Sequence, residues 1–305
     1  MSSETPPEAG RLGEFLRSRR ARLSPAEAGI TSYGARRVPG LRREELAQLA
    51  GVSSTYYTRL EQGQSGHASA EVIAAIAAAL RLDDDERAHL RDLARPVRPR
   101  RRRPAPPAAA RAGTARLIAA MTDVPALVMD RRSEVLAWNW LGHALLAGHL
   151  DVSAPEHAAG RPNLTRMLFL DPRTRELYPR WAEEAARAVA SLRMVAGRYR
   201  DDRGLTDLVG ELTVQSDDFA RLWSRQPVLN CFAGTKQFRH PVVGDFELEF
   251  EVLHLPDDSG HRILTYTAVP GTAAAGALLL LASAVAPGAG PTAGGPAPVR
   301  NRRAG

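Results

Sequence analysis

Cysteine and lysine are almost missing from this chain of 305 residues, which has one Cys, one Lys and 40 Arg. A single cysteine, Cys231, cannot form an intramolecular disulfide, so a disulfide-stapled secreted scaffold and an all-cysteine metal site are excluded. The first 15 residues contain no apolar stretch. We therefore expect no signal peptide and a cytoplasmic, nucleoid-associated protein.

Long hydrophobic runs are also scarce. The longest, within residues 271–286 (GTAAAGALLLLASAVA), has about 13 apolar residues. A membrane-spanning helix needs roughly 18 to 20. We expect a terminal helix that docks on its own domain and no membrane span, with membrane association as the alternative.

Positive charge is concentrated in the first third of the chain. Residues 1–103 carry 19 Arg against 13 acidic residues, whereas residues 104–299 carry 19 basic and 21 acidic residues. The overall net charge is +7. This asymmetry is typical of a nucleic-acid-binding module joined to a neutral one.

The pattern of apolar residues predicts two domains between polar ends. Residues 1–11 and 286–305 are expected to be disordered tails, and residues 12–94 show five helical stripes, which predict a small all-α domain. Residues 95–111 combine Arg with Pro (RPVRPRRRRPAPP at 95–107) and are expected to form a linker, either as a solvated spacer or as an additional phosphate-tracking arm.

Residues 112–285 predict an α+β domain. Residues 125–130 and 134–138 indicate a hairpin, and residues 245–253 (DFELEFEVL) alternate strictly between apolar and acidic side chains. Such alternation is typical of a half-buried antiparallel strand. Residues 235–240 and 262–269 complete a meander with it. Helical stretches at 163–168, 178–195 and 216–224 lie between, and we expect the helices to stack on one face of the sheet.

The strongest local motif spans residues 42–63 (RREELAQLAGVSSTYYTRLEQG). An amphipathic helix ends at Gly51, which permits a left-handed turn, and Ser53 is placed to cap the next helix. Two short helices joined in this way form a helix-turn-helix, whose second helix fits the major groove. An αα-hairpin that does not bind DNA is the alternative. The segment resembles the lambda-repressor-like (XRE-type) helix-turn-helix, and five helices agree with that fold.

The resemblance implies roles for individual residues. Ser54, Thr55 and Arg59 match positions that face DNA bases, and Arg59 can span O6 and N7 of a guanine. Arg42, Arg43 and Thr58 match phosphate-contacting positions. Arg20 and Glu61 match a structural ion pair between the first helix and the recognition helix.

A second resemblance covers residues 12–285. Five segments carry it: VPGLRREE (38–45), VLAWN (135–139), LFLDPR (168–173), LVGEL (208–212) and GTKQFRHPVVG (234–244). They resemble bacterial regulators whose C-terminal part is an MmyB-like ligand-binding domain. The resemblance implies a PAS-like fold with an apolar pocket, which holds a fatty acid in some members. Trp140 departs from the pattern, because smaller residues or Pro are usual there.

Several residues of the second domain are candidates for this pocket. The aromatic candidates are Trp138, Phe169, Trp181 and Trp223, with ordinary core packing as the alternative. An acyl carboxylate needs a cation or a donor at the pocket mouth. Arg193, Arg239 and His240 are the candidates for that role. No other cofactor is indicated.

Catalysis has little support in the sequence. His143, His149 and His157 lack metal-ligand spacing, and no Walker-type lysine loop is present. Cys231 and His240 could form a thiol dyad, but Cys231 lies in an apolar stretch and is expected in the core. We therefore predict a homodimeric transcription regulator that binds operator DNA and a small apolar ligand, and not an enzyme. The alternative is a DNA-binding protein whose second domain only dimerises or docks a protein partner.

Overall fold

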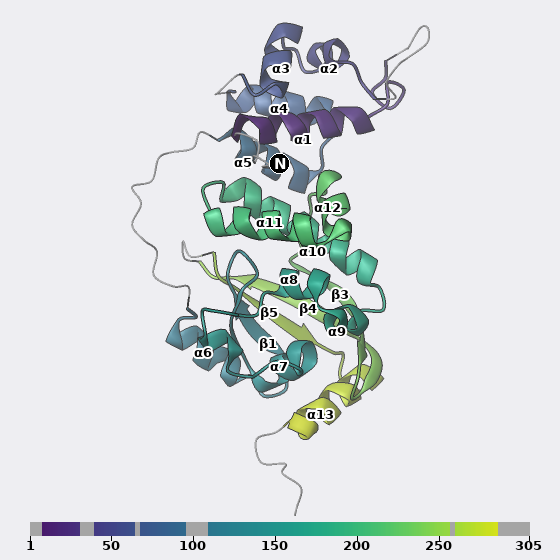
Figure 1. Cartoon of the computed structure of the whole chain (residues 1–305). Coiled ribbons are helices and arrows are strands. Elements are labelled where there is room, and N and C mark those ends of the chain that lie inside the picture. Colours follow the sequence, from purple (N-terminus) through teal and green to yellow (C-terminus); the bar gives the residue numbers. More distant parts are fainter. Residues whose placement is uncertain (1–7, 31–39, 65–67, 96–108, 257–259, 286–305) are drawn as a thin grey trace, which may run out of the picture.

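The computed structural model describes residues 8–30, 40–64, 68–95, 109–256 and 260–285. Within these ranges the chain forms a helical domain stacked on an α+β domain, as Figure 1 shows. Both parts of the predicted fold class are confirmed. Residues 96–108 of the linker, residues 1–7 of the N-terminal tail and the whole C-terminal tail lie outside the described residues. Residues 8–11, which were predicted to belong to the N-terminal tail, are part of the first helix.

The first domain consists of five helices around one apolar core. They are α1 (Glu8–Arg22), α2 (Arg43–Leu49), α3 (Ser54–Glu61), α4 (Ala70–Ala79) and α5 (Asp84–Ala94). Three of these helices follow a residue whose side chain caps the first turn. Ser53, Ser69 and Asp83 each accept a hydrogen bond from the backbone N–H three residues later. These caps satisfy N–H groups that a helix start leaves unpaired, which explains why the short helices begin where they do.

The second domain contains a five-stranded sheet in the order β2-β1-β5-β4-β3, with all neighbours antiparallel. The strands are β1 (Ala126–Met129), β2 (Val135–Trp138), β3 (Ala233–His240), β4 (Gly244–His254) and β5 (Arg262–Thr267). The hairpin and the meander predicted from the sequence are therefore both present. In β4, Leu248 and Phe250 are buried, while Glu247, Glu249 and Glu251 face solvent.

The helices of the second domain cover the sheet unequally. They are α6 (Ala112–Ala119), α7 (Trp140–Ala147), the 3₁₀ turn η1 (Ala154–Glu156), α8 (Leu164–Leu170), α9 (Pro172–Leu177), α10 (Trp181–Arg198), α11 (Arg203–Gln215), α12 (Asp217–Ser224) and α13 (Ala273–Val285). Buried side chains from α7, α8, α9 and α13 pack on the face that carries Leu127 and Tyr266. Helices α10–α12 lie between this layer and the first domain (Figure 1).

The expectation that all helices stack on one sheet face is wrong for α6. Ile118 of α6 packs with Ala126, Val128 and Ile263, which point to the opposite side of the sheet. Both faces of β1 are therefore covered, and all four of its residues are buried. A strand that is apolar on both faces needs cover on both, and α6 supplies the second cover.

The C-terminal helix α13 docks on α7 and β4, as expected. Leu278 and Leu281 are buried in this contact, whereas Leu279 and Leu280 are each 64% exposed. No described helix is long and apolar enough to cross a membrane.

Asn139 joins three elements of the second domain. Its Oδ1 accepts hydrogen bonds from the N–H groups of Gly142, at 2.7 Å, and Ala126, at 3.0 Å. Its Nδ2 donates to the carbonyls of Met121 and Val124, each at 2.7 Å, at the end of α6. One buried amide thus caps α7, as the sequence predicts, and also connects α6, β1 and α7.

Replacing Asn139 by Ala should lower the free energy of unfolding of the second domain by about 2 to 3 kcal/mol, because a cap is lost and buried polar groups are left unpaired. Urea denaturation measures the change. Gln215→Ala, at an exposed position of α11, is the control and should change stability by less than about 0.5 kcal/mol. A loss of similar size in both variants would contradict this role of Asn139.

Candidate functional site

Helices α2 and α3 are joined by a sharp turn at Gly51. Its φ of +66° lies in the left-handed region that favours glycine. The N–H of Val52 then returns to the carbonyl of Ala47 at 3.0 Å, and Ser53 caps α3 by accepting a hydrogen bond from Tyr56 N–H at 3.1 Å. The turn therefore sets α3 across α2, with a capped N-terminus and one free face.

The two faces of α3 differ completely in exposure. Tyr57, Leu60 and Glu61 are buried, and Ser54, Thr55 and Arg59 are exposed. Within the described residues, no hydrogen bond or ion pair engages the side chain of Arg59. The three residues with the implied base-facing role thus share the solvent side of one helix, where they can reach a groove.

Glu61 lies beneath this face and carries the main charge cluster of the first domain. Arg20 donates to both carboxylate oxygens in a bidentate arrangement at 2.9 Å, and Arg43 donates from Nε at 3.0 Å. Burial by itself raises the pKa of Glu61, but the hydrogen bonds and charges of the arginines outweigh it and the net shift is downward. The ionised carboxylate therefore ties α1, α2 and α3 together.

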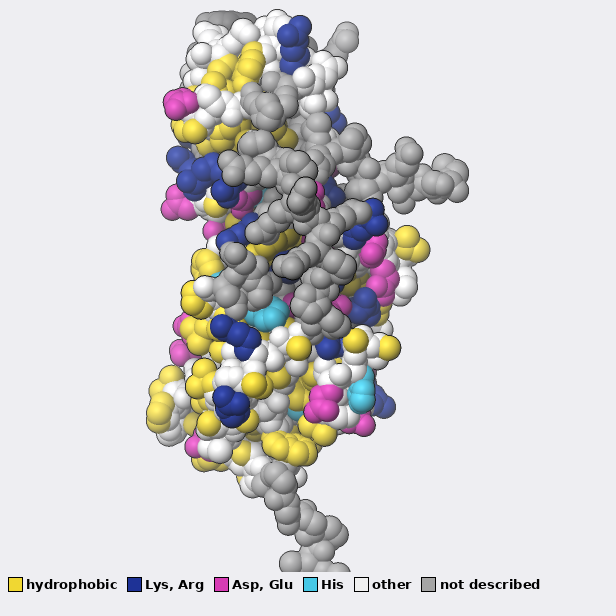
Figure 2. Space-filling model, turned by 90° about the vertical axis from the view of Figure 1, so that its left-hand side faces the viewer, with side chains coloured by type: hydrophobic (Ala, Val, Ile, Leu, Met, Phe, Trp, Pro, Cys, Tyr) yellow, Lys and Arg dark blue, Asp and Glu magenta, His cyan; other side chains and the backbone are white. Residues whose placement is uncertain are grey.

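The three residues with implied phosphate contacts lie in different surroundings. Arg42 is exposed, Thr58 is half-buried, and the Arg43 side chain is 39% exposed while it pairs with Glu61. That Arg43 pairs with Glu61 is not evident from the sequence. On the face shown in Figure 2, Lys and Arg side chains occur over both domains, interleaved with acidic and hydrophobic ones. The coloured Lys and Arg side chains therefore form no single continuous patch on that face.

Replacing Glu61 by Gln should destabilise the first domain by about 3 kcal/mol, since removing one partner of a buried ion pair leaves the other uncompensated. The folded-state pKa of Glu61 is depressed, so its stabilisation is present above the unfolded-state value of about 4.3 and is lost as the pH falls through the folded-state value. Urea midpoints at pH 7 and pH 3.5 measure this. Glu44→Gln, on the exposed side of α2, is the control. An equal gap between wild type and Glu61→Gln at both pH values would contradict the ionic role.

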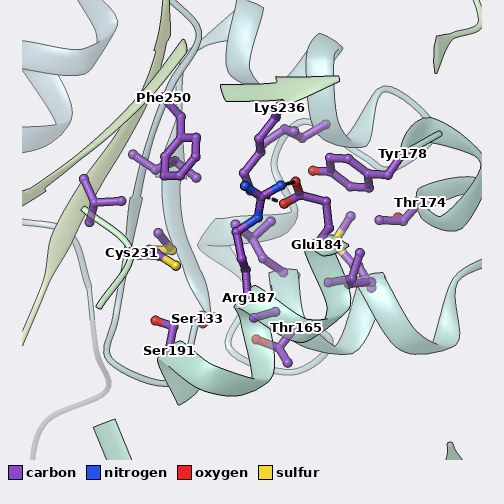
Figure 3. A pocket seen from close by; sticks show the side chains of 18 of the residues that line it. Ser133, Thr165, Thr174, Tyr178, Glu184, Arg187, Ser191, Cys231, Lys236 and Phe250 are labelled. Atoms are coloured by element: carbon purple, nitrogen blue, oxygen red, sulfur yellow. Dashed lines mark hydrogen bonds and ion pairs between the residues drawn. The ribbon is translucent and has the colours of Figure 1, made fainter. Parts of the chain in front are cut away.

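The second domain contains a cavity of about 120 Å³ between its helices and its sheet. Residues of α8 and α10 form one wall, and residues of β3, β4 and β5 form the other. Most of the wall is apolar, including Leu164, Leu168, Phe250 and Leu264. Figure 3 shows a charged cluster in this setting, with Glu184 and Arg187 reaching from α10 toward Lys236 of β3.

Cations outnumber carboxylates on this wall. Lys236 Nζ lies 3.1 Å from a carboxylate oxygen of Glu184, and Arg187 also pairs with Glu184. Arg262 donates to Ser133 Oγ at 3.0 Å, while its Nε has no hydrogen-bond partner among the described residues. The described wall carries one carboxylate, Glu184, and three cations, Arg187, Lys236 and Arg262. Buried Asp130, which does not line the cavity, acts on Arg262 through its field, so two carboxylates stand against three cations. An anionic group in the cavity would balance the remaining positive charge.

The other polar groups of the cavity are neutral. Burial raises the pKa of both Tyr178 and Tyr266, which keeps their phenols protonated and able to donate. Burial also raises the pKa of Cys231. The sequence predicts Cys231 in the core, whereas the structure places it half-buried on the cavity wall. As a neutral thiol it is a weak nucleophile there.

The ligand candidates from the sequence do not share this cavity. Phe169 and Trp181 pack edge to face at 5.7 Å, and Trp223 stacks on Phe219 at 5.6 Å, within a separate apolar cluster. Trp138 donates to the Val152 carbonyl. Arg239 is exposed and pairs with Asp245, and buried His240 contacts the Ala144 carbonyl at 3.0 Å. Arg193 lies with Trp223 at the junction between the domains.

Four charged residues of the cavity were not found from the sequence: Glu184, Arg187, Lys236 and Arg262. Lys236 carried a signal, since it is the one lysine beside 40 arginines and occupies an inward position of a predicted strand. Glu184 and Arg187 are three residues apart on one helix face, but an i, i+3 pair is usually a surface pair. Only the packing of α10 on the sheet reveals that Glu184 is buried.

Comparison with known families places both domains. Residues 110–281 match the family described as MmyB-like transcription regulator ligand binding domain. Residues 11–90 match a helix-turn-helix domain family. A search of curated proteins found no match.

Proposed function

Because the chain belongs to the family of MmyB-like transcription regulators, with a helix-turn-helix domain before its ligand-binding domain, we propose that it recognises a specific operator and responds to a small apolar acid. The matched families are those of a DNA-binding and a ligand-binding domain of a regulator. They favour a regulatory over a catalytic role.

The exposed face of α3 is the observation that carries operator recognition. Ser54, Thr55 and Arg59 present two hydroxyls and a guanidinium on a capped helix, and these groups can hydrogen-bond base edges in the major groove. Arg42, Arg43 and Thr58 flank this face and supply phosphate contacts, which set the register without reading sequence. The buried Glu61 cluster keeps α3 in place.

A homodimer is the assembly that suits such a module. One recognition helix contacts only a few base pairs, so useful specificity needs two half-sites read by a symmetric pair. The exposed Leu279 and Leu280 of α13 offer apolar area for association. They also favour the second candidate function, in which the C-terminal domain only dimerises or docks a protein partner.

The charge balance of the cavity supports an acidic ligand with an apolar body, such as a fatty acid. Lys236 and Arg262 can meet a carboxylate, and the apolar wall can take an alkyl chain. For such a ligand to regulate, it must bind one arrangement of the two domains more tightly than another. Helix α10 lines the cavity in the second domain and also contacts α5 of the DNA-binding domain.

Arg59→Ala should weaken binding to the cognate operator by about 1 to 3 kcal/mol and relax specificity at one base pair, because a bidentate guanine contact is lost. Binding is measured by fluorescence anisotropy on operator and random duplexes at several salt concentrations. Arg91→Ala, which removes an exposed arginine from α5, is the control. If Arg59→Ala lost the same affinity for operator and random DNA, the assignment of Arg59 to base contacts would be wrong.

Lys236→Gln should weaken the binding of a fatty acid 10-fold to 100-fold, because a charge-assisted hydrogen bond is lost. Isothermal titration calorimetry with saturated acids of four to ten carbons, and with the corresponding alcohols, measures the effect and its dependence on charge. Arg239→Gln, on the outward side of the same strand, is the control and should bind normally. Operator binding measured with and without the acid then separates a sensor from a domain that only dimerises.

If no acid binds to the wild type and none co-purifies with it in native mass spectrometry, the ligand proposal fails and the dimerisation reading is favoured. If acids and alcohols bind equally well, the cavity is an apolar site in which Lys236 plays no part.

A further inference from the structure

A second and larger cavity lies at the junction of the two domains. Its volume is about 270 Å³, compared with about 120 Å³ for the first cavity. Helices α1 and α5 of the first domain and α10 and α11 of the second contribute to its walls, together with Trp223 and Gln226. A water molecule needs only about 10 to 15 Å³ of such space, so the cavity can take a small organic molecule.

The junction around this cavity is closely packed. A Cβ on Gly197 of α10 would lie 2.5 Å from the ring of His89 on α5, so only glycine permits this approach. Arg19 of α1 donates to the Gln226 carbonyl at 2.8 Å, and the N–H of Asn230 donates to Asp85 at 2.7 Å. Figure 1 shows α10–α12 directly beneath the helices of the first domain. The cavity walls are therefore defined by specific contacts.

Arg193 places a positive charge on this wall without a carboxylate partner. The residue is only 7% exposed. Its guanidinium lies 3.8 Å above the Trp223 ring, donates to Gln226 Oε1 at 2.7 Å and contacts the Trp223 carbonyl. Its Nε has no hydrogen-bond partner among the described residues. All partners of this buried cation in the described part of the chain are therefore neutral groups.

The two carboxylates on the same wall do not fill this role. Asp202 is engaged by Arg131 and Arg132. Glu14 raises the pKa of Arg193 through its field, but the described residues include no ion pair between them. A buried charge without a counterion is costly, which leaves a place for an anion.

Arg193 and His89 nevertheless have defined charge states. Burial lowers the pKa of Arg193 to about 9, so it remains charged at pH 7. Burial lowers the pKa of His89 to about 3, with further lowering by Arg193 and Arg19, so the imidazole is neutral. His89 is 2% exposed, and its Nδ1 has no hydrogen-bond partner among the described residues. The wall thus offers two cations, buried Arg193 and half-buried Arg11, and one neutral imidazole beside apolar side chains such as Leu205 and Val209.

We propose that this junction cavity is a second ligand site, which binds a compact aromatic acid with its carboxylate at Arg193 and its ring among Leu205, Val209 and Trp223. Such an occupant touches α5 of the DNA-binding domain and α10 and α11 of the second domain at once. It therefore holds the two domains in the arrangement seen here. The site does not depend on the ligand of the first cavity, and any effect on operator binding rests on the proposed function.

The test uses the full-length protein with 1-naphthoate and benzoate as acids and with the corresponding amides as neutral analogues. Isothermal titration calorimetry gives affinity, and urea denaturation gives stability without ligand. We expect both acids to bind wild type at least 10-fold more tightly than the amides. Arg193→Met should reduce acid affinity at least 10-fold, because the charge-assisted contact is lost.

Stability separates this role from a purely structural one. Without ligand, Arg193→Met should be as stable as wild type or more stable, because it removes an uncompensated buried charge. Val209→Trp, which fills the cavity without changing its charge, should also abolish acid binding. Lys236→Gln is the matched control in the first cavity and should leave naphthoate binding unchanged.

Four outcomes would overturn the proposal. In the first, neither acid binds the wild type. In the second, Arg193→Met and Val209→Trp bind naphthoate as tightly as the wild type does. In the third, only Lys236→Gln loses naphthoate binding, which would place the acid in the first cavity. In the fourth, Arg193→Met is less stable than the wild type and binds acid and amide equally well, which would give Arg193 a structural role in holding α12. Failure of operator binding in Arg59→Ala, by contrast, bears only on the proposed function.

Discussion

Helix α10 packs on both domains, and the relation between the two halves of the molecule depends on this double contact. Its first half directs Glu184 and Arg187 into the cavity against the sheet. Its second half meets α5, where Gly197 lets the ring of His89 approach the helix backbone. The 18 residues of α10 thus form one continuous helix that reaches from the first cavity to the DNA-binding domain. Helix α10 is therefore a direct physical connection between the first cavity and the helical domain.

Buried charge distinguishes the structural clusters from the candidate ligand sites. Glu61 is surrounded by arginines that also connect three helices, so its charge is compensated within the first domain. In the first cavity, Glu184 faces more than one cation, and positive charge is left over. Arg193 has no carboxylate partner in the described residues. Since uncompensated buried charge is costly, these last two places are where an anion would be favourable.

Much of the architecture could be predicted from local patterns in the sequence. The alternation in β4 reflects a period of two that only a strand with one buried face produces, and Gly51 and Ser53 mark a turn whose backbone geometry few other residues allow. None of the ligand candidates from the sequence lines the first cavity, although Arg193 and Trp223 line the one at the domain junction. Phe169 and Trp181 pack on each other and Trp138 meets the Val152 carbonyl, all outside the first cavity, because aromatic composition carries no information on which sheet face or helix a side chain meets.

The sequence by itself determined the two domains, the helix-turn-helix, the hairpin and the meander, since these follow from periodicity, caps and turns within a few neighbouring residues. The tertiary structure alone decided that α6 covers the far face of β1, that Lys236 meets Glu184, and that Arg193 is enclosed at the domain junction. Each of these contacts joins residues far apart in the chain. Their proximity depends on how whole elements pack, and no local pattern encodes that packing.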